Sequence, residues 1–208
     1  MNMQFIGLLS ATFVLLSPDY SLGQSWFEYV NRTDRFSVNL PGEPQVQDFD
    51  YESEFAAIFP ARLYTLKDGS NRYSVTVVDF TDAQKIHAEM DKTEAASAEN
   101  IWINDQRASI IRAAREFRQR GSEVTYDGWG HIDRGEGEQL QLTNSDGTRT
   151  FAGIYLHMPG RRLYILEATV PADTPPPGQF QQSLRFLDED GNRMRYKRHS
   201  DGGATRIL

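Results

Sequence analysis

The chain of 208 residues contains no cysteine. This absence excludes a disulfide framework, a cysteine-ligated metal centre, thiolate chemistry and a lipid-modified cysteine anchor, so the hydrophobic core alone must hold the fold. Basic charge is also scarce, because 22 Lys and Arg stand against 29 Asp and Glu and give a net charge of −7. We therefore expect no nucleic-acid partner, since such proteins favour basic surfaces.

The only long hydrophobic run lies at the N-terminus, over residues 5–16, and is too short to span a bilayer. Pro18 follows the run, and Ser21 and Gly23 form a small-x-small cleavage site. This layout predicts a cleavable signal peptide over residues 1–23 and a periplasmic or secreted mature chain without a transmembrane span. No Lys or Arg precedes the run, so an uncleaved N-terminal anchor is the alternative.

Signatures of known chemistry are missing as well. The sequence holds no GxSxG elbow, no HExxH spacing and no dinucleotide fingerprint, and no pair of carboxylates stands out for acid–base work. Four histidines are scattered, and only His131 and His157, with Asp133, could meet in space to bind a metal. We expect no catalytic set, no metal and no cofactor; an enzyme whose site forms only in three dimensions is the alternative.

Hydrophobic periodicity and turn residues divide the chain into two groups of strands with a helical segment between them. Strands are expected over residues 26–30, 36–40, 62–66, 73–80, 124–132, 138–143, 148–157 and 161–170, and helices over 82–90, 93–100, 105–120 and 174–186. This order predicts an α+β domain, an antiparallel sheet with helices packed on it, over residues 24–188. Residues 189–208 are expected to form a polar, basic, flexible tail.

The strongest helical pattern covers residues 105–120. Asn104 or Asp105 can cap its N-terminus, and Gly121 stands where a left-handed residue ends a helix. The apolar stripe that should face the core consists of Ile110, Ala113, Ala114 and Phe117. The opposite side carries the arginines Arg107, Arg112, Arg115 and Arg118.

Two groups of residues are candidates for binding. The four helix arginines could bind phosphate, a carboxylate or an acidic protein surface, although pairing with the chain's own acidic residues is favoured. The second group is the aromatic set Tyr126, Trp129, Tyr155 and Tyr164. An exposed set, with Trp129 foremost, would indicate a protein-binding surface, whereas burial in the core is favoured.

The sequence resembles a family at two places. The first is the segment FSVNLPGEP at residues 36–44, and the second is RLYILEATVP at 162–171, followed by Phe180 and QSLRF at 182–186. These segments are similar to those of small exported bacterial proteins of unknown function with a PsbP/Mog1-like α+β sandwich. The resemblance implies an antiparallel sheet and a non-enzymatic accessory or binding role, and it assigns no site residue.

The sequence therefore leads to one hypothesis with two alternatives. The first is an exported, non-catalytic binding or accessory module whose partner is an envelope protein or an acidic ligand. The second is a hydrolytic or metal-dependent enzyme. The third is a peripheral protein of the envelope surface that uses the helix arginines or the basic tail on anionic lipid.

Overall fold

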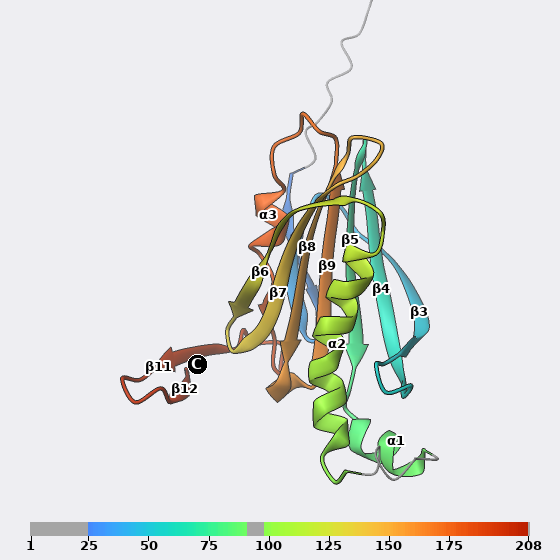
Figure 1. The fold of residues 1–208 in the computed structure, drawn as a ribbon. Helices are drawn as coiled ribbons and strands as arrows, with labels where there is room; N and C mark the ends of the chain where they lie inside the picture. The colour runs from blue at the N-terminus through green and yellow to red at the C-terminus, as the bar shows by residue number, and fades with distance from the viewer. Residues whose placement is uncertain (1–24, 91–97, 208) are drawn as a thin grey trace, which may run out of the picture.

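The computed structural model describes residues 25–90 and 98–207. Its centre is a seven-stranded sheet in which every neighbouring pair is antiparallel (Figure 1). The strands, in their order across the sheet, are β3 (Gln45–Glu52), β4 (Ile58–Asp68), β5 (Asn71–Asp79), β9 (Arg162–Val170), β8 (Arg149–His157), β7 (Gly135–Thr143) and β6 (Glu123–Ile132). The α+β class and the antiparallel sheet expected from the sequence are confirmed.

One face of this sheet, called the helix face below, is covered by α2 (Ile101–Arg118), with α1 (Ala83–Glu89) beside the start of α2 (Figure 1). The four residues of the expected apolar stripe on α2 are all buried. They pack on side chains of the sheet that alternate along each strand, such as Leu140 and Leu142 of β7. This contact forms the first of two hydrophobic cores.

The opposite face, called the back face, is covered by a small sheet with the strand order β1-β2-β10 and by the short helix α3. These elements are β1 (Phe27–Asn31), β2 (Phe36–Leu40), α3 (Gly178–Gln181) and β10 (Arg185–Phe186). Phe36 packs edge-on against Tyr64 with 5.1 Å between ring centroids, and Phe186 lies 5.2 Å from Tyr164. The fold therefore has three layers and a second core rich in aromatic side chains.

Two of the expected helices differ from the structure in their bounds. The main helix begins at Ile101 rather than near residue 105, and Asn100 stands at its N-cap. Asp105 is not a cap because its carboxylate is fully buried and binds side chains from other segments. The helix expected over 174–186 is limited to the four residues of α3, since the chain then turns into β10.

The remaining expectations concern the ends of the chain and the helix after α1. The predicted signal peptide and residues 93–97 of the predicted helix lie outside the described residues, and residues 98–100 are not helical. The segment expected to be a tail contains a hairpin of β11 (Arg195–Arg198) and β12 (Ala204–Ile207). Within residues 25–90 and 98–207, no helix is long and apolar enough to cross a membrane.

The turn between β6 and β7 lies earlier than expected. Asp133 and Arg134 adopt left-handed conformations, with φ of 41° and 71°, and form a two-residue hairpin turn. Residues 135–137, expected to form the turn, instead begin β7. A Cβ on Gly135 would lie 2.8 Å from the Phe186 ring, and one on Gly137 would meet Tyr155 and the backbone of β8. The absence of a side chain at these two glycines therefore allows the aromatic rings of Phe186 and Tyr155 to pack against β7 on the back face.

Candidate binding surface

The structure separates the four helix arginines. Arg115 forms a bidentate ion pair with Glu54, with N–O distances of 3.1 and 2.5 Å, and Arg112 forms an ion pair with Glu116 at 3.1 Å. Arg118 binds Asp127 and Glu138 together. Among the described residues, Arg107 has no ion-pair partner. Three of the four guanidiniums thus already bind carboxylates of the same chain, and an acidic ligand would have to displace them.

The aromatic set divides into two pairs. Tyr155 and Tyr164 are buried in the back core, whereas Tyr126 is 46% exposed and Trp129 is 76% exposed. The position of β6 at the edge explains the difference, because α2 packs on β7, β8 and β9 on the helix face and α3 packs on β8 and β9 on the back face. Residues of β6 on the helix face therefore lie beside α2 rather than under it. Trp129 belongs to this face because it pairs with Glu138, whose neighbour Leu140 is in the helix-side core.

A shallow cavity of about 380 Å³ lies between Trp129 and the side of α2. Its lining residues, called the Trp129 surface below, are Ile111, Arg118, Asp127, Gly128, Trp129 and Glu138. Ile111 is 54% exposed, so two large apolar side chains from different elements face solvent at the same place. Exposed apolar side chains are common singly, but a paired set beside fixed charges is typical of contact surfaces.

The charged side chains of the Trp129 surface hold one another in place. Arg118 donates to both carboxylate oxygens of Asp127, at 2.7 and 2.9 Å, and to Glu138. The hydrogen bond from Arg118 lowers the pKa of Asp127, while burial, followed by the hydrogen bond to Asp127, raises the pKa of Glu138. The indole of Trp129 therefore lies next to an ordered polar network of one guanidinium and two carboxyl groups.

The outer edge of β6 adds main-chain hydrogen-bonding groups to this region. β6 is the last strand in the sheet order, so no strand of the described part of the chain pairs with its outer side. A bulge between Val124 and Tyr126 interrupts its pairing with β7. Bulges of this kind protect an edge strand against unspecific pairing, and the regular stretch beyond the bulge, which contains Trp129, stays accessible.

The metal site considered from the sequence does not form. His131 pairs with Glu136 and lies on the helix face, whereas His157 stacks on Phe186 on the back face, so the sheet separates the two imidazoles. In the described parts of the chain, no group of three or more His, Asp or Glu side chains is placed to hold a metal ion.

A second cluster, which the sequence did not indicate, joins Ser53, His87 and Asp105. Ser53 Oγ donates to Asp105 Oδ2 at 2.6 Å, and His87 Nε2 lies 2.8 Å from the same oxygen. The residue types are those of a hydrolase triad, but serine and histidine both contact the aspartate, and all three side chains are buried. The serine hydroxyl therefore contacts the aspartate instead of the histidine, unlike a catalytic serine, and the cluster joins α1 and α2 to the segment between β3 and β4.

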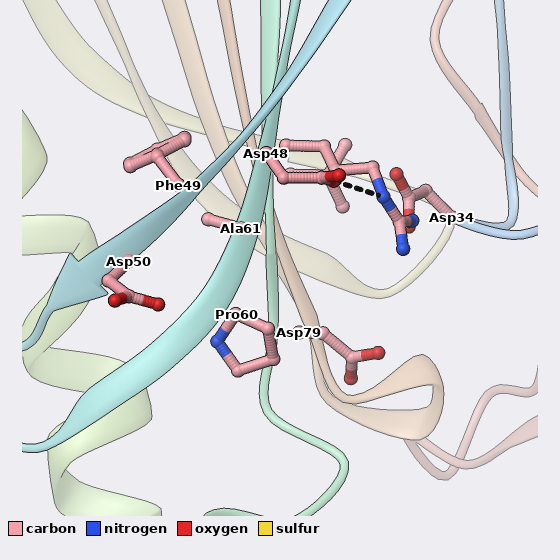
Figure 2. A pocket seen from close by; sticks show the side chains of 9 residues that line it. Asp34, Asp48, Phe49, Asp50, Pro60, Ala61 and Asp79 are labelled. Carbon is pink, nitrogen blue, oxygen red and sulfur yellow. Dashed lines mark hydrogen bonds and ion pairs between the residues drawn. The ribbon is translucent and has the colours of Figure 1, made fainter.

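Another cavity, of about 530 Å³, lies on the back face beside the β1–β2 turn (Figure 2). Four aspartates line it, Asp34, Asp48, Asp50 and Asp79, together with Arg62 and apolar side chains. Asp34 is buried and accepts hydrogen bonds from Arg62 and Tyr64, and Arg62 Nε donates to Asp48 at 2.9 Å. Two of the aspartates thus share one guanidinium, and a third, Asp79, forms an ion pair with Arg162.

The solved structures that are similar to this chain include the following two. The solution structure of the cyanobacterial PsbP protein CyanoP from Synechocystis sp. PCC 6803 has 12% sequence identity, covers 83% of this chain and 99% of that chain, and gives a TM-score of 0.45. A protein from Bacteroides thetaiotaomicron VPI-5482 has 13% identity, covers 80% of this chain and 50% of that chain, and gives a TM-score of 0.35.

The first of these chains is described as a PsbP protein, a name that also belongs to the family that the sequence segments resemble. Likenesses of this size concern the fold, and no feature of the Trp129 surface is taken from them. No protein-family model and no curated protein matches the chain.

Proposed function

We propose that this chain is an exported, non-catalytic binding module that contacts a partner protein of the cell envelope through the Trp129 surface. The observation that carries the proposal is the 76% exposure of the Trp129 side chain on an edge strand. Tryptophan is enriched among the residues that dominate protein interfaces, because its large rigid ring buries much apolar area at little entropic cost. The export half of the proposal rests on the signal-peptide pattern of residues 1–23.

The geometry of the surface also favours a particular partner chemistry. An apolar side chain of the partner would cover Trp129 and Ile111, and hydrogen-bond donors of the partner would face Asp127 and Glu138. An acidic ligand on the helix arginines receives less support, because three of them already bind carboxylates. The open edge of β6 can accept an extended segment of the partner as a further strand.

Site-specific photo-crosslinking in the intact envelope tests this proposal. A photoreactive residue at position 111 should give one discrete crosslinked product, and the additional change Trp129→Ala should remove it. The same residue at position 46, which is 52% exposed on the opposite edge strand β3, is the matched control and should give none. Equal crosslinking from both positions, or crosslinking that survives Trp129→Ala, would contradict the proposal.

A further inference from the structure

A smaller cavity lies on the back face of β7 and β8, away from the Trp129 surface. It measures about 210 Å³ and is bounded on one side by the end of α3. Its lining residues are Gln139, Gln141, Ala152, Gly153, Tyr155, Leu166, Gln181 and Gln182. Four of the eight are glutamines and none carries a charge, in a chain in which a quarter of all residues are charged.

Glycines allow two tyrosine rings to lie flat on the sheet at this place. A Cβ on Gly153 would lie 2.9 Å from the Tyr155 ring, and a Cβ on Gly128 would lie 2.8 Å from the hydroxyl of Tyr126. Tyr126 pairs directly with Gln141 across the strands, so its half-exposed ring borders the amide cluster. Of the two rings, that of Tyr126 is the exposed one and lies beside the cavity, whereas the Tyr155 ring is buried.

The amide groups of the cavity have unused hydrogen-bonding capacity. Gln139 donates from Nε2 to the Tyr155 hydroxyl at 2.6 Å, which fixes that amide and leaves its oxygen as a free acceptor. The side chains of Gln141, Gln181 and Gln182 form no hydrogen bond with other described residues. Each primary amide offers two donors and one acceptor, so the cavity presents donors and acceptors side by side without net charge.

We propose that this cavity binds the ring of a neutral saccharide. A sugar hydroxyl both donates and accepts hydrogen bonds, and this double role matches a set of primary amides. The absence of charged side chains from the lining favours an uncharged ligand, since an ionised group would lose its hydration without a counter-charge. The ring of Tyr126 supplies an apolar surface for the C–H face of the sugar.

Nuclear magnetic resonance on the uniformly ¹⁵N-labelled mature protein tests the proposal directly. Glucose, galactose, N-acetylglucosamine and cellobiose are titrated separately, and glucuronic acid serves as the charged counterpart. We expect at least one neutral sugar to produce saturable shifts in the side-chain amide signals of the four lining glutamines, with no shift of the Trp129 indole N–H on the helix face. Absence of saturable shifts with all four neutral sugars, or equal shifts with glucuronic acid, would overturn the proposal.

A pair of substitutions separates loss of the site from loss of the fold. Gln141→Leu removes one amide that makes no hydrogen bond inside the described chain, and we expect about tenfold weaker sugar binding from the lost contacts. Gln47→Leu, at an exposed glutamine of the distant strand β3, is the matched control and should leave binding unchanged. Equal affinity in the two variants would overturn the assignment of the site.

Discussion

Burial keeps one histidine of this chain neutral. His157 is 1% exposed and stacks on Phe186 with 4.3 Å between ring centroids. Burial, assisted by the charges of Arg162 and Arg134, lowers the pKa of His157 to about 4. Protonation would place a cation among aromatic side chains next to two guanidiniums, so the folded state disfavours the charged imidazole.

This histidine should make stability depend on pH in a defined window. The unfolded chain binds the proton with a pKa near 6.5 and the folded chain only near 4, so the free energy of unfolding should fall as the pH drops from 6.5 towards 4. The loss should reach at most about 3 kcal/mol at the acid end. Urea unfolding at a series of pH values measures this loss. The His157→Asn variant should lack the part of the pH dependence of the unfolding free energy that comes from His157. Identical slopes in the two proteins would contradict the account.

The buried cluster around Asp105 should be structural rather than catalytic. Asp105→Ala leaves the donors of Ser53 and His87 without their acceptor in the core, and we expect a loss of about 3–5 kcal/mol in the free energy of unfolding. Glu116→Ala breaks an ion pair with Arg112 whose glutamate is 54% exposed, and it should cost less than about 0.5 kcal/mol. Urea unfolding compares the two variants, and similar losses would contradict the assignment.

At the level of elements, local patterns predicted most of the strands and the core stripe of α2. β3 was missed because it is an edge strand with mostly exposed polar residues, and Tyr51 alone on it is buried. The start of α2 was placed too late because Asp105 resembles a cap, whereas its carboxylate binds residues far away in the sequence. Interactions between distant segments decide both features, and a local pattern does not contain them.

The candidate site was foreseen only in part, for the same reason. Trp129 was singled out from the sequence, but burial was favoured for the aromatic set, and Ile111 was not considered. Exposure of Trp129 depends on β6 being the last strand and on α2 stopping at β7, which follow from the topology of the whole sheet. The pairing of the helix arginines with acidic residues, by contrast, was the favoured interpretation, and the structure places three of the four in ion pairs.

The close approach of β7 and β8 predicts a sensitive glycine. A Cβ at Gly137 would collide with the carbonyl oxygen of Ile154 and with the Tyr155 ring, neither of which can move freely. Gly137→Ala should therefore lower the free energy of unfolding by about 1–3 kcal/mol through overpacking. Gly130→Ala is the control, because its Cβ would meet only the Gln139 side chain, at 3.1 Å. Thermal unfolding compares the two variants. Equal stability would contradict the claim that the close approach of β8 excludes a side chain at Gly137.

For the whole molecule, the proposed function assigns export and docking to different parts of the chain. The signal-peptide pattern occupies residues 1–23, and the Trp129 surface lies on β6 and α2 at one edge of the sheet. Cleavage after Gly23 should give a mature protein that begins with Gln24. Intact-mass measurement of the protein from the envelope fraction checks this, and a chain that retains residues 1–23 would indicate an uncleaved anchor instead.

Co-purification from the native envelope tests the docking claim most directly. The wild-type protein, Trp129→Ala and the control Val46→Ala are isolated under identical conditions, and the molar ratio of any bound protein is determined. We expect a partner at a fixed stoichiometric ratio with the wild type and with Val46→Ala, and at least about tenfold less with Trp129→Ala, as for a dominant interface residue. A partner retained at full ratio by Trp129→Ala would contradict the account, as would the absence of any stoichiometric partner from the wild type.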